Sequence, residues 1–357
     1  GDGYNVAVGK NAGFAVTTGV QNTLIGGLAG DALTDGGQNV AVGLGALTSD
    51  TRGSRATALG YGTLQTQNFT SVTNTYNTAV GYNAGAAVTT GLYNTLIGAF
   101  TGDALTTSVA NTAVGYASLT DATTSNNNTA VGYTSLSYNT TGIANVALGR
   151  GALETSTTGS ANVALGFQAG GYDVSNTTGG QNIFLGAYSH ATASGATYAY
   201  AIGYNVAGAA GYTTIGNSGS TIRTAHGNIT WAALSDERYK KDIADSTAGL
   251  AFINALQPRT WKYKTLGELP ETFTAYKEGS TEVFKNTQTN HGFIAQEVKA
   301  AIDADASIKD GFRLWDDRED GSQEVAEAAL IPVLVKAIQE QSALITSLTA
   351  RVAELEG

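Results

Sequence analysis

The sequence predicts a mostly β protein, in which a solenoid of repeats of about 17 residues precedes a small α+β domain and a C-terminal coiled-coil helix. Three observations support this prediction. A five-residue motif recurs over residues 1–234, the composition changes after residue 234, and the last stretch spaces its apolar residues in heptads. We therefore expect three domains, at residues 1–234, 235–329 and 330–357.

The repeated motif is Asn-(Thr/Val)-(Ala/Leu)-(Val/Ile/Leu)-Gly. Successive copies lie 17 residues apart, except for steps of 21 residues after Ala56, 20 residues after Asn162 and 13 residues at the end. Clear copies start at Asn5, Asn22, Asn39, Asn77, Asn94, Asn111, Asn128, Asn145 and Asn162, and degenerate copies at Ala56, Asn182, Ala199 and Tyr212. Such regular spacing is typical of a repeat architecture.

Each repeat is too short for a helix pair, and its β-branched residues and fixed glycines favour a short strand followed by a turn. In Asn77–Gly81, alternation places Thr78 and Val80 on one face of a strand and Ala79 on the other. One coil buries almost no apolar surface alone, whereas stacked coils share a continuous core. The repeats therefore predict a rod of stacked coils.

The copies Asn145–Gly149 and Asn162–Gly166 resemble the head repeats of trimeric autotransporter adhesins, and similar repeats occur in phage tail fibres. The resemblance implies a left-handed β-roll in a bundle of three chains. The 17-residue period is longer than is usual in adhesin heads, which leaves the geometry of each coil open.

The composition excludes several classes of function. The 357 residues include 46 Gly and 13% charged residues, with 39 glycines before residue 235 and all three prolines after it. The absence of Cys excludes disulfides and cysteine nucleophiles, and a net charge of −10 disfavours nucleic acid as a partner. We find no long apolar run or signal peptide, so we expect no membrane insertion, and we expect no cofactor. The absence of Met predicts a processed product or a fragment.

Two features of the solenoid are candidates for recognition. An aromatic residue recurs after the motif glycine, at Tyr61, Tyr82, Tyr116, Tyr133, Phe167 and Tyr204. Such a row is able to stack sugars, but any fixed repeat produces ladders, so we interpret it as rings packing on one another. The long steps around Gln65–Tyr76 and Gly171–Gly180 are better candidates, because insertions map to surface loops.

Catalysis and metal binding are not expected in the solenoid. Glycoside hydrolysis needs two placed carboxylates, and residues 1–234 contain one Glu, Glu154, and seven Asp. His190 and His226 have no second His at ligand spacing. Most of the Asp lie in turn contexts that favour hydrogen bonds to the backbone, as do Asp31, Asp35 and Asp50.

The composition changes where the chain reads Ser-Asp-Glu-Arg-Tyr-Lys, from Ser235 to Lys240. Considered alone, Ser235 is a helix N-cap, with Asp236 and Glu237 in the first turn, where the helix dipole favours negative charge. Ser235 and Lys240 would lie about 140° apart around a helix. Spacing alone therefore does not predict a catalytic pair.

Three motifs in order, Ser235–Lys240, Leu250–Tyr263 and His291–Val298, resemble the C-terminal intramolecular chaperone domain of endosialidase-type phage tailspikes. The resemblance implies a domain that trimerises, templates the folding of the β-rich stalk before it, and then cuts itself off with a serine/lysine dyad. It assigns Ser235 as the nucleophile and Lys240 as the general base.

The dyad chemistry is physically reasonable, because a serine hydroxyl needs a base and a lysine serves only as the neutral amine. We expect Lys240 to be desolvated or placed near other cations. Glu237, Arg238 and His291 are candidate supporting residues, with a structural hydrogen-bonding role as the alternative for His291. Tyr239 replaces the usual aliphatic residue of the family.

Two peptide bonds next to Ser235 are candidates for cleavage. Attack by the Ser235 hydroxyl on the preceding carbonyl passes through a five-membered ring, which favours the bond between Leu234 and Ser235. The bond between Ser235 and Asp236 is the alternative.

The remaining C-terminal elements follow from local patterns. Leu250–Leu256 predicts a short helix stopped by Pro258, Arg259–Lys264 alternates as a strand, and His291–Val298 reads as a strand end that leads into a helix. The final helix has heptad positions a and d at Ile331, Leu334, Ile338, Gln341, Ile345, Leu348, Val352 and Leu355. Ile at a with Leu at d nominally favours dimers, but Gln341 breaks this rule and both resemblances imply trimers.

Together these features predict the distal part of a phage tail fibre or tailspike, a homotrimer whose chaperone domain releases itself by autoproteolysis. Such a protein belongs to the virion, folds in the host cytoplasm, and has a host cell-surface receptor, a glycan or an outer-membrane component, as a further candidate partner. A non-cleaving trimeric cell-surface adhesin is the alternative. A polysaccharide-degrading spike is a weaker one, because the solenoid has few carboxylates.

Overall fold

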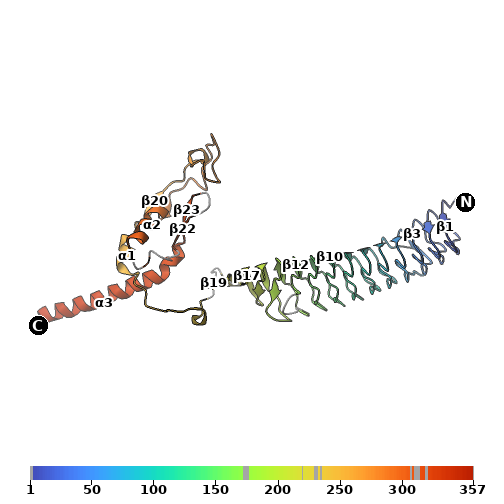
Figure 1. Cartoon of the computed structure of the whole chain (residues 1–357), viewed down its shortest axis with the longest axis horizontal. Helices are drawn as coiled ribbons and strands as arrows, with labels where there is room; N and C mark the ends of the chain where they lie inside the picture. Colours follow the sequence, from blue (N-terminus) through green and yellow to red (C-terminus); the bar gives the residue numbers. More distant parts are fainter. Residues whose placement is uncertain are drawn as a thin grey trace. The chain divides into compact units, whose positions relative to one another are not determined.

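The computed structural model describes residues 3–171, 177–218, 220–228, 232–233, 235–305, 308, 314–317 and 321–356. The chain divides into two compact units, Gly1–Asp236 and Glu237–Gly357 (Figure 1). The first unit is a β-solenoid, and the second is a small α+β unit that ends in a long helix. The predicted fold class is therefore confirmed.

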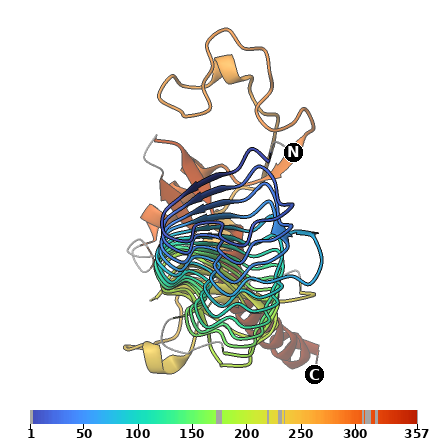
Figure 2. The same ribbon diagram turned by 90° about the vertical axis from the view of Figure 1, so that its right-hand side faces the viewer.

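One short strand from each coil joins a sheet that runs along the solenoid. Successive motif copies pair in register, so that Thr112 lies opposite Thr129 and Thr129 opposite Val146. Figure 2, viewed from the N-terminal end of the solenoid, shows the coils superposed. In spatial order the strands of this sheet are β1 (Val6–Val8), β2 (Thr23–Ile25), β3 (Val40–Val42), β5 (Thr57–Leu59), β7 (Thr78–Val80), β8 (Thr95–Ile97), β9 (Thr112–Val114), β10 (Thr129–Val131), β11 (Val146–Leu148), β12 (Val163–Leu165), β13 (Ile183–Leu185), β15 (Tyr200–Tyr204), β17 (Tyr212–Asn217), β18 (Ser220–Ala225) and β19 (Ala232–Ala233).

Two further pairs of short strands lie in the solenoid outside this sheet. β4 (Gly53–Ser54) pairs with β6 (Thr73–Asn74), and β14 (His190–Ala191) pairs with β16 (Ala207–Gly208). The first pair holds the long coil around Gln65–Tyr76 against the coil before it. That insertion is therefore a wider coil of the same stack.

The middle residue of each three-residue strand, apart from the exposed first strand β1, points into the solenoid. Ala79 is fully buried, whereas Thr78 and Val80 are only half-buried, as the alternation predicts. Leucines from the turn segments, such as Leu64 and Leu105, fill the rest of the interior. Each coil thus supplies a few core residues, and stacking makes the core continuous.

The motif asparagine is buried and bonds to the following coil. Asn145 accepts the backbone N–H of Asn162 at Oδ1 (3.0 Å), and its Nδ2 donates to the carbonyl of Gly159 (2.8 Å). An asparagine side chain offers both a donor and an acceptor. Because an unpaired buried backbone group costs about 1–3 kcal/mol, the motif requires this residue.

The motif glycine is required by the stacking of coils. Gly115 has a φ of +133°, and a Cβ at this position would lie 2.4 Å from the carbonyl oxygen of Gly132 in the next coil. An L side chain fits neither this backbone conformation nor this space. The glycine therefore allows two coils to approach each other.

The motif asparagines form a ladder of hydrogen bonds from coil to coil. This asparagine ladder is interrupted at Ala56, where the motif has no asparagine. Gln67 donates from Nε2 to the buried Asp50 carboxylate (2.6 Å), and its Oε1 accepts from Nδ2 of Asn77 (2.8 Å). Asp50 also accepts the backbone N–H of Gly53 (2.8 Å). Burial raises the pKa of Asp50, although these hydrogen bonds oppose the shift. An aspartate–glutamine pair thus fills the interior of the 21-residue coil.

The sheet changes direction at its C-terminal end. β17 runs parallel to β15, but β18 runs antiparallel to β17, and β19 runs antiparallel to β18. The repeated parallel stack therefore ends in an antiparallel hairpin with one additional strand.

The second unit packs three helices and one small hairpin around one apolar cluster. Phe252, Val298, Ile302, Leu314 and Val333 are buried in this cluster. The elements are η1 (Glu237–Tyr239), α1 (Leu250–Ala255), β20 (Arg259–Trp261), η2 (Leu266–Glu268), β21 (Asn290–Gly292), α2 (Ala295–Ala304), β22 (Trp315–Asp317), β23 (Gln323–Val325), η3 (Glu327–Ala329) and α3 (Leu330–Glu356). Both predicted short helices and the strand leading into α2 are confirmed, whereas the strand predicted over Arg259–Lys264 ends at Trp261.

The first turns of α3 pack against α1. Leu330, Val333 and Ala337 are buried on this face, and the Glu340 carboxylate accepts the backbone N–H of Leu250 (2.8 Å). A Cβ on Gly249 would lie 2.4 Å from that carboxylate. Glu340 therefore caps the start of α1, and glycine leaves room for it.

The segment Glu327–Glu356, which includes α3, is long and apolar enough to cross a membrane by length and composition alone. Its apolar residues nevertheless follow heptad spacing, and Lys336 and Glu340 lie 3.9 Å apart within it. A helix whose apolar residues form the interface of a coiled coil has the same composition. The absence of membrane insertion stays a prediction.

Candidate functional site

Ser235 and Lys240 lie on either side of the division between the two units. Ser235 comes two residues after the end of β19, and Lys240 directly follows η1. The N–H of Lys240 donates to the carbonyl of Glu237 (2.8 Å), which closes this single turn. The prediction that Ser235 caps a helix is wrong, because the turn begins at Glu237 and Asp242 adopts a left-handed φ of +54°, which stops further helix.

The side chains around the proposed dyad are open to solvent in the single chain. Ser235, Glu237, Arg238 and Lys240 are exposed, and Asp236 is half-buried. The expected desolvation of Lys240 is therefore not present in one chain. Leu234, the residue before the nucleophile, lies outside the described residues.

His291, the third candidate supporting residue, lies in β21. It is paired in register with Thr260 of β20, and its side chain is exposed. Its supporting role stays a prediction.

An ion pair brings the second and third sequence motifs together. Arg259 of β20 donates to both carboxylate oxygens of Glu297 in α2, from Nη2 at 2.8 Å and from Nε at 2.9 Å. The hydrogen bonds lower the pKa of Glu297 and raise the pKa of Arg259. Two-point contact of this kind fixes orientation as well as distance. The motifs thus position one another across β20 and α2.

Aromatic side chains line an open groove in the second unit. Trp261, Tyr263, Phe273, Phe284 and Phe293 contribute to its walls. The rings of Tyr263 and Phe284 meet edge to face at 5.6 Å between centroids. Sequence analysis did not single out Phe273 and Phe284, because no periodic pattern marks the long connection between β20 and β21.

The predicted aromatic row of the solenoid exists, and its rings contact one another. Tyr61 and Tyr82 stack at 5.1 Å between centroids, and Tyr116 and Tyr133 stack at 5.3 Å. The faces that would stack on sugars are therefore occupied by neighbouring rings. This geometry supports the packing interpretation.

Three members of the row were missed by sequence analysis. Phe100 and Tyr188 come one residue later in their coils than the other rings, yet they join the row edge to face. Arg150 fills a further position, with its guanidinium carbon 5.7 Å from the Tyr133 ring and 5.2 Å from the Phe167 ring. A search for aromatic or Arg residues within one position of the expected site would have found them.

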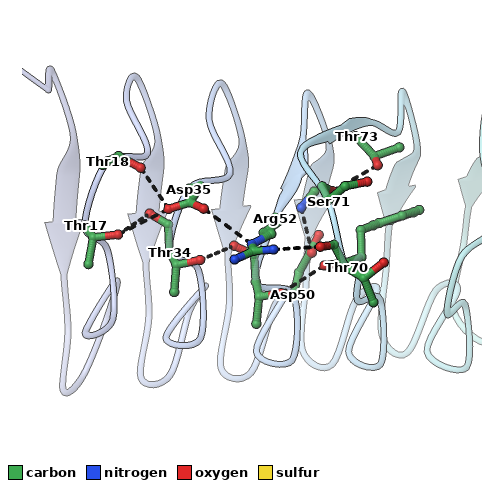
Figure 3. A network of polar contacts seen from close by, with 12 residues as sticks. Thr17, Thr18, Thr34, Asp35, Asp50, Arg52, Thr70, Ser71 and Thr73 are labelled. Carbon is green, nitrogen blue, oxygen red and sulfur yellow. Dashed lines mark hydrogen bonds and ion pairs between the residues drawn. The ribbon is translucent and has the colours of Figure 1, made fainter.

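Half-buried aspartates of the solenoid bond to neighbouring coils. The Thr18 hydroxyl donates to Asp35 (2.8 Å), and Arg52 Nε lies 3.3 Å from the same carboxylate (Figure 3). The Thr48 hydroxyl donates to Asp31 (2.5 Å). These contacts join coils across the surface.

The two solenoid histidines have separate partners. His190 is buried, with Nδ1 3.0 Å from the Tyr188 carbonyl oxygen, and His226 Nε2 lies 3.3 Å from the Thr213 hydroxyl. Within the described part of the chain, no three His, Asp or Glu side chains form a group that could hold a metal ion. Of the two long steps, the one at Gly171–Gly180 includes residues 172–176, which lie outside the described residues.

Comparison with known families adds one finding. Residues 235–306 match the model of the family described as chaperone of endosialidase. The match starts at Ser235 and includes all three motifs that carried the resemblance. Comparison with curated proteins and with solved structures found no match. A β-solenoid is thus followed by a segment that is similar to the endosialidase chaperone family.

Proposed function

We propose that this chain is the distal part of a trimeric phage tail fibre or tailspike, whose second unit drives trimerisation and folding of the solenoid and then releases itself by cleavage next to Ser235. This proposal rests on the order of the solenoid and the second unit along the chain. A solenoid of fibre-type repeats ends, and the match to the endosialidase chaperone family begins, within a few residues of each other.

The outward face of the solenoid sheet supports association between chains. The first and third residues of the strands point outward, and many are apolar and exposed, among them Val40, Leu59, Ile97, Val146 and Leu148. A contiguous apolar stripe of this kind is uncommon on a monomer and marks an interaction surface. In a homotrimer, three such faces would cover one another.

The C-terminal helix supports association in a second way. Its apolar heptad residues are all exposed, although its other face is buried against α1. Ile338 is 63% exposed and Leu348 is 58% exposed. Exposed apolar residues at a and d are what a coiled coil covers when chains associate. The seam is therefore available for other chains.

The proposed cleavage uses Ser235 and Lys240 in a balanced sequence. The Ser235 Oγ attacks the carbonyl carbon of Leu234 while the neutral Lys240 amine takes the hydroxyl proton. The C–N bond breaks, the proton passes to the departing Ser235 amine, and an ester links Leu234 to the Ser235 oxygen. Water then hydrolyses the ester to a Leu234 carboxylate and a free hydroxyl, so one water is consumed.

Assembly would supply the environment that Lys240 lacks. The side chain is exposed in one chain, and water stabilises the charged amine, which cannot act as a base. A neighbouring chain that covers Lys240 would favour the neutral amine. Cleavage would then follow trimer formation, which is the order a folding chaperone requires.

Three variants test this proposal on denaturing gels and by intact mass. Wild type should yield two fragments whose masses locate the bond at Leu234–Ser235 or at Ser235–Asp236. Ser235→Ala and Lys240→Ala should stay full length while still forming trimers, and Lys264→Ala, an exposed cation elsewhere in the unit, should be cut normally. An uncut wild-type trimer would contradict the protease assignment and favour the non-cleaving adhesin.

The assignment to a virion, with folding in the host cytoplasm and a glycan or outer-membrane component as receptor, belongs to the same proposal. It is supported by the resemblance of the repeats and of the second unit to fibre proteins. Mass spectrometry of purified particles provides the test. Particles should contain peptides from the solenoid and lack those that follow the cut.

A further inference from the structure

The last strands of the solenoid lie directly before the proposed cleavage point. β18 pairs with β17 on one side and with β19 on the other. β19 is the final strand in the order of the sheet and ends at Ala233, two residues before Ser235. Ala232 and Ala233, shortly before the nucleophile, therefore belong to the solenoid sheet.

The direction of the hydrogen-bonding groups in β18 follows from one contact. The N–H of His226 donates to the carbonyl of Gly211 (2.9 Å), on the β17 side. Because successive residues of an antiparallel strand point their backbone groups to opposite sides, Thr224 and Ile222 also face β17, whereas Arg223 faces β19. Arg223 is paired in register with Ala232. Its backbone thus holds β19.

We propose that β18 is the positioning element for autocleavage, because it holds Ala232 and Ala233, shortly before Ser235, in a paired strand. This inference rests on the proposed Ser235 cleavage. An extended strand keeps the backbone beyond it in a defined direction, and orientation of the reacting groups lowers an activation barrier. Without this pairing, Ala232 and Ala233 lose the contact that fixes the direction of the backbone near Ser235.

The arrangement also couples cleavage to completion of the solenoid. β19 docks on β18, β18 docks on β17, and β17 docks on β15, the last coil strand that pairs in parallel on both sides. Each strand needs the previous one as a template. β19 is therefore ordered only after the final coil has formed, and an unfinished solenoid stays attached to the unit that folds it.

The test compares Arg223→Pro with Arg223→Ala in the full chain. Proline removes the backbone N–H that faces β19, whereas alanine keeps it. Both variants lose the guanidinium that lies 5.1 Å from the Tyr212 ring, so this contact is matched. We expect Arg223→Ala to be cut at the wild-type rate, and Arg223→Pro to be cut at least about tenfold more slowly, since orientation effects of this size are ordinary in catalysis.

Trimer formation and the melting temperature of the solenoid should be the same in both variants. Cleavage of Arg223→Pro at the wild-type rate would overturn the inference and leave the Ser235 proposal intact. Failure of wild type to cleave would instead remove the proposed function. Loss of cleavage in both variants would show that cleavage depends on the Arg223 side chain and not on its backbone N–H. That result would also overturn the inference.

A second pair of variants decides the matter where Arg223→Pro does not fold. Ala232→Pro removes the N–H of β19 that faces Arg223, and Ala232→Ser keeps it, with β17 and β18 unchanged in both. Slow cleavage of the proline variant alone supports the inference. Equal cleavage of the two, in folded trimers, contradicts it.

Discussion

The solenoid and the second unit stabilise themselves in different ways. The solenoid fills its interior within one chain, with a buried Ala, Leu or Phe in each strand of the long sheet from β2 to β15 and an asparagine bond from most coils to the next. The second unit has one small core and a 27-residue helix of which only Leu330, Val333 and Ala337 are buried. The solenoid has a core that one chain fills by itself. The second unit has a long helix that is mostly exposed and is available to other chains.

This difference explains why a solenoid of this kind benefits from a folding partner. Its coils are so alike that a chain displaced by one coil against its neighbour would meet nearly the same residues. Register between strands is weakly specified where the pattern repeats. The second unit does not repeat, so its association defines a single register for all chains. The second unit therefore determines the register in which the chains associate.

The largest expected effect comes from the seam of α3. Ile345→Asp combined with Leu348→Asp places charge at two exposed apolar positions, and burial of such side chains contributes about 1.5–3 kcal/mol each in every chain. We expect complete loss of the trimer, measured by analytical ultracentrifugation of the uncut Ser235→Ala background. Ala350→Asp, on the same helix but outside the a and d positions, should remain trimeric.

A retained trimer in the double variant would contradict the comparison between the two regions. It would show that the solenoid sheet face alone selects and holds the partners. The seam would then be a surface without a role in assembly.

The next largest effect, on the stability of the solenoid, is expected from a substitution in the asparagine ladder. Asn111 accepts the N–H of Asn128 (3.0 Å) and donates to the carbonyl of Ser125 (2.9 Å). Asn111→Ala leaves both backbone groups buried without a partner, at a cost of about 2–6 kcal/mol. Thermal unfolding followed by circular dichroism should show a lower melting temperature of the solenoid and an unchanged trimer.

Thr124→Ala, at an exposed position of a nearby coil, provides the matched control and should melt like wild type. If Asn111→Ala also melts like wild type, the ladder does not stabilise the stack. Stability would then come from apolar packing alone.

A smaller effect depends on pH and distinguishes the 21-residue coil from its neighbours. The folded pKa of Asp50 lies above its unfolded value because of burial. Its favourable contribution is therefore complete below the unfolded pKa and is lost as pH rises through the folded pKa. Asp50→Asn removes this ionisation, so its melting temperature should vary less with pH than that of wild type.

The melting temperature of wild type should rise relative to that of the variant as the pH is lowered toward 4. A constant difference between them over this range would contradict the assignment of a raised pKa. The measurement needs only thermal unfolding at several pH values, in the uncut background.

The regularity of the solenoid made its fold predictable. Alternation correctly placed Thr78 and Val80 on one face and Ala79 on the other, because a period of two leaves only two choices, and the structure shows that the Ala79 face is the buried one. The sequence did not indicate what Asn111 binds, since its partners are backbone groups 14 and 17 residues later. Nor did it indicate that Gln67 and Asp50 replace an absent asparagine, because this contact depends on the stacking of two coils.

The candidate site was less predictable, for a different physical reason. Ser235 and Lys240 were identified by resemblance to a family, and local reasoning placed Ser235 on a helix that the structure shortens to one turn at Glu237. The role of β19 was not visible, because strand pairing between Arg223 and Ala232 joins segments with no shared pattern. Contacts that depend on chain topology leave no periodic signal.

The smallest expected effect concerns the aromatic row, and it sharpens the distinction between packing and recognition. Tyr116 is 48% exposed and stacks on Tyr133, so Tyr116→Ala should cost only about 0.5–1.5 kcal/mol for the ring pair. If the row served to stack sugars, the same variant would weaken retention of the trimer on immobilised host polysaccharide. Because the ring faces are already occupied by neighbouring rings, we expect a slightly lower melting temperature and unchanged retention. The opposite result, a large loss of retention with no change in melting temperature, would make the row a binding surface and would give the solenoid a recognition role.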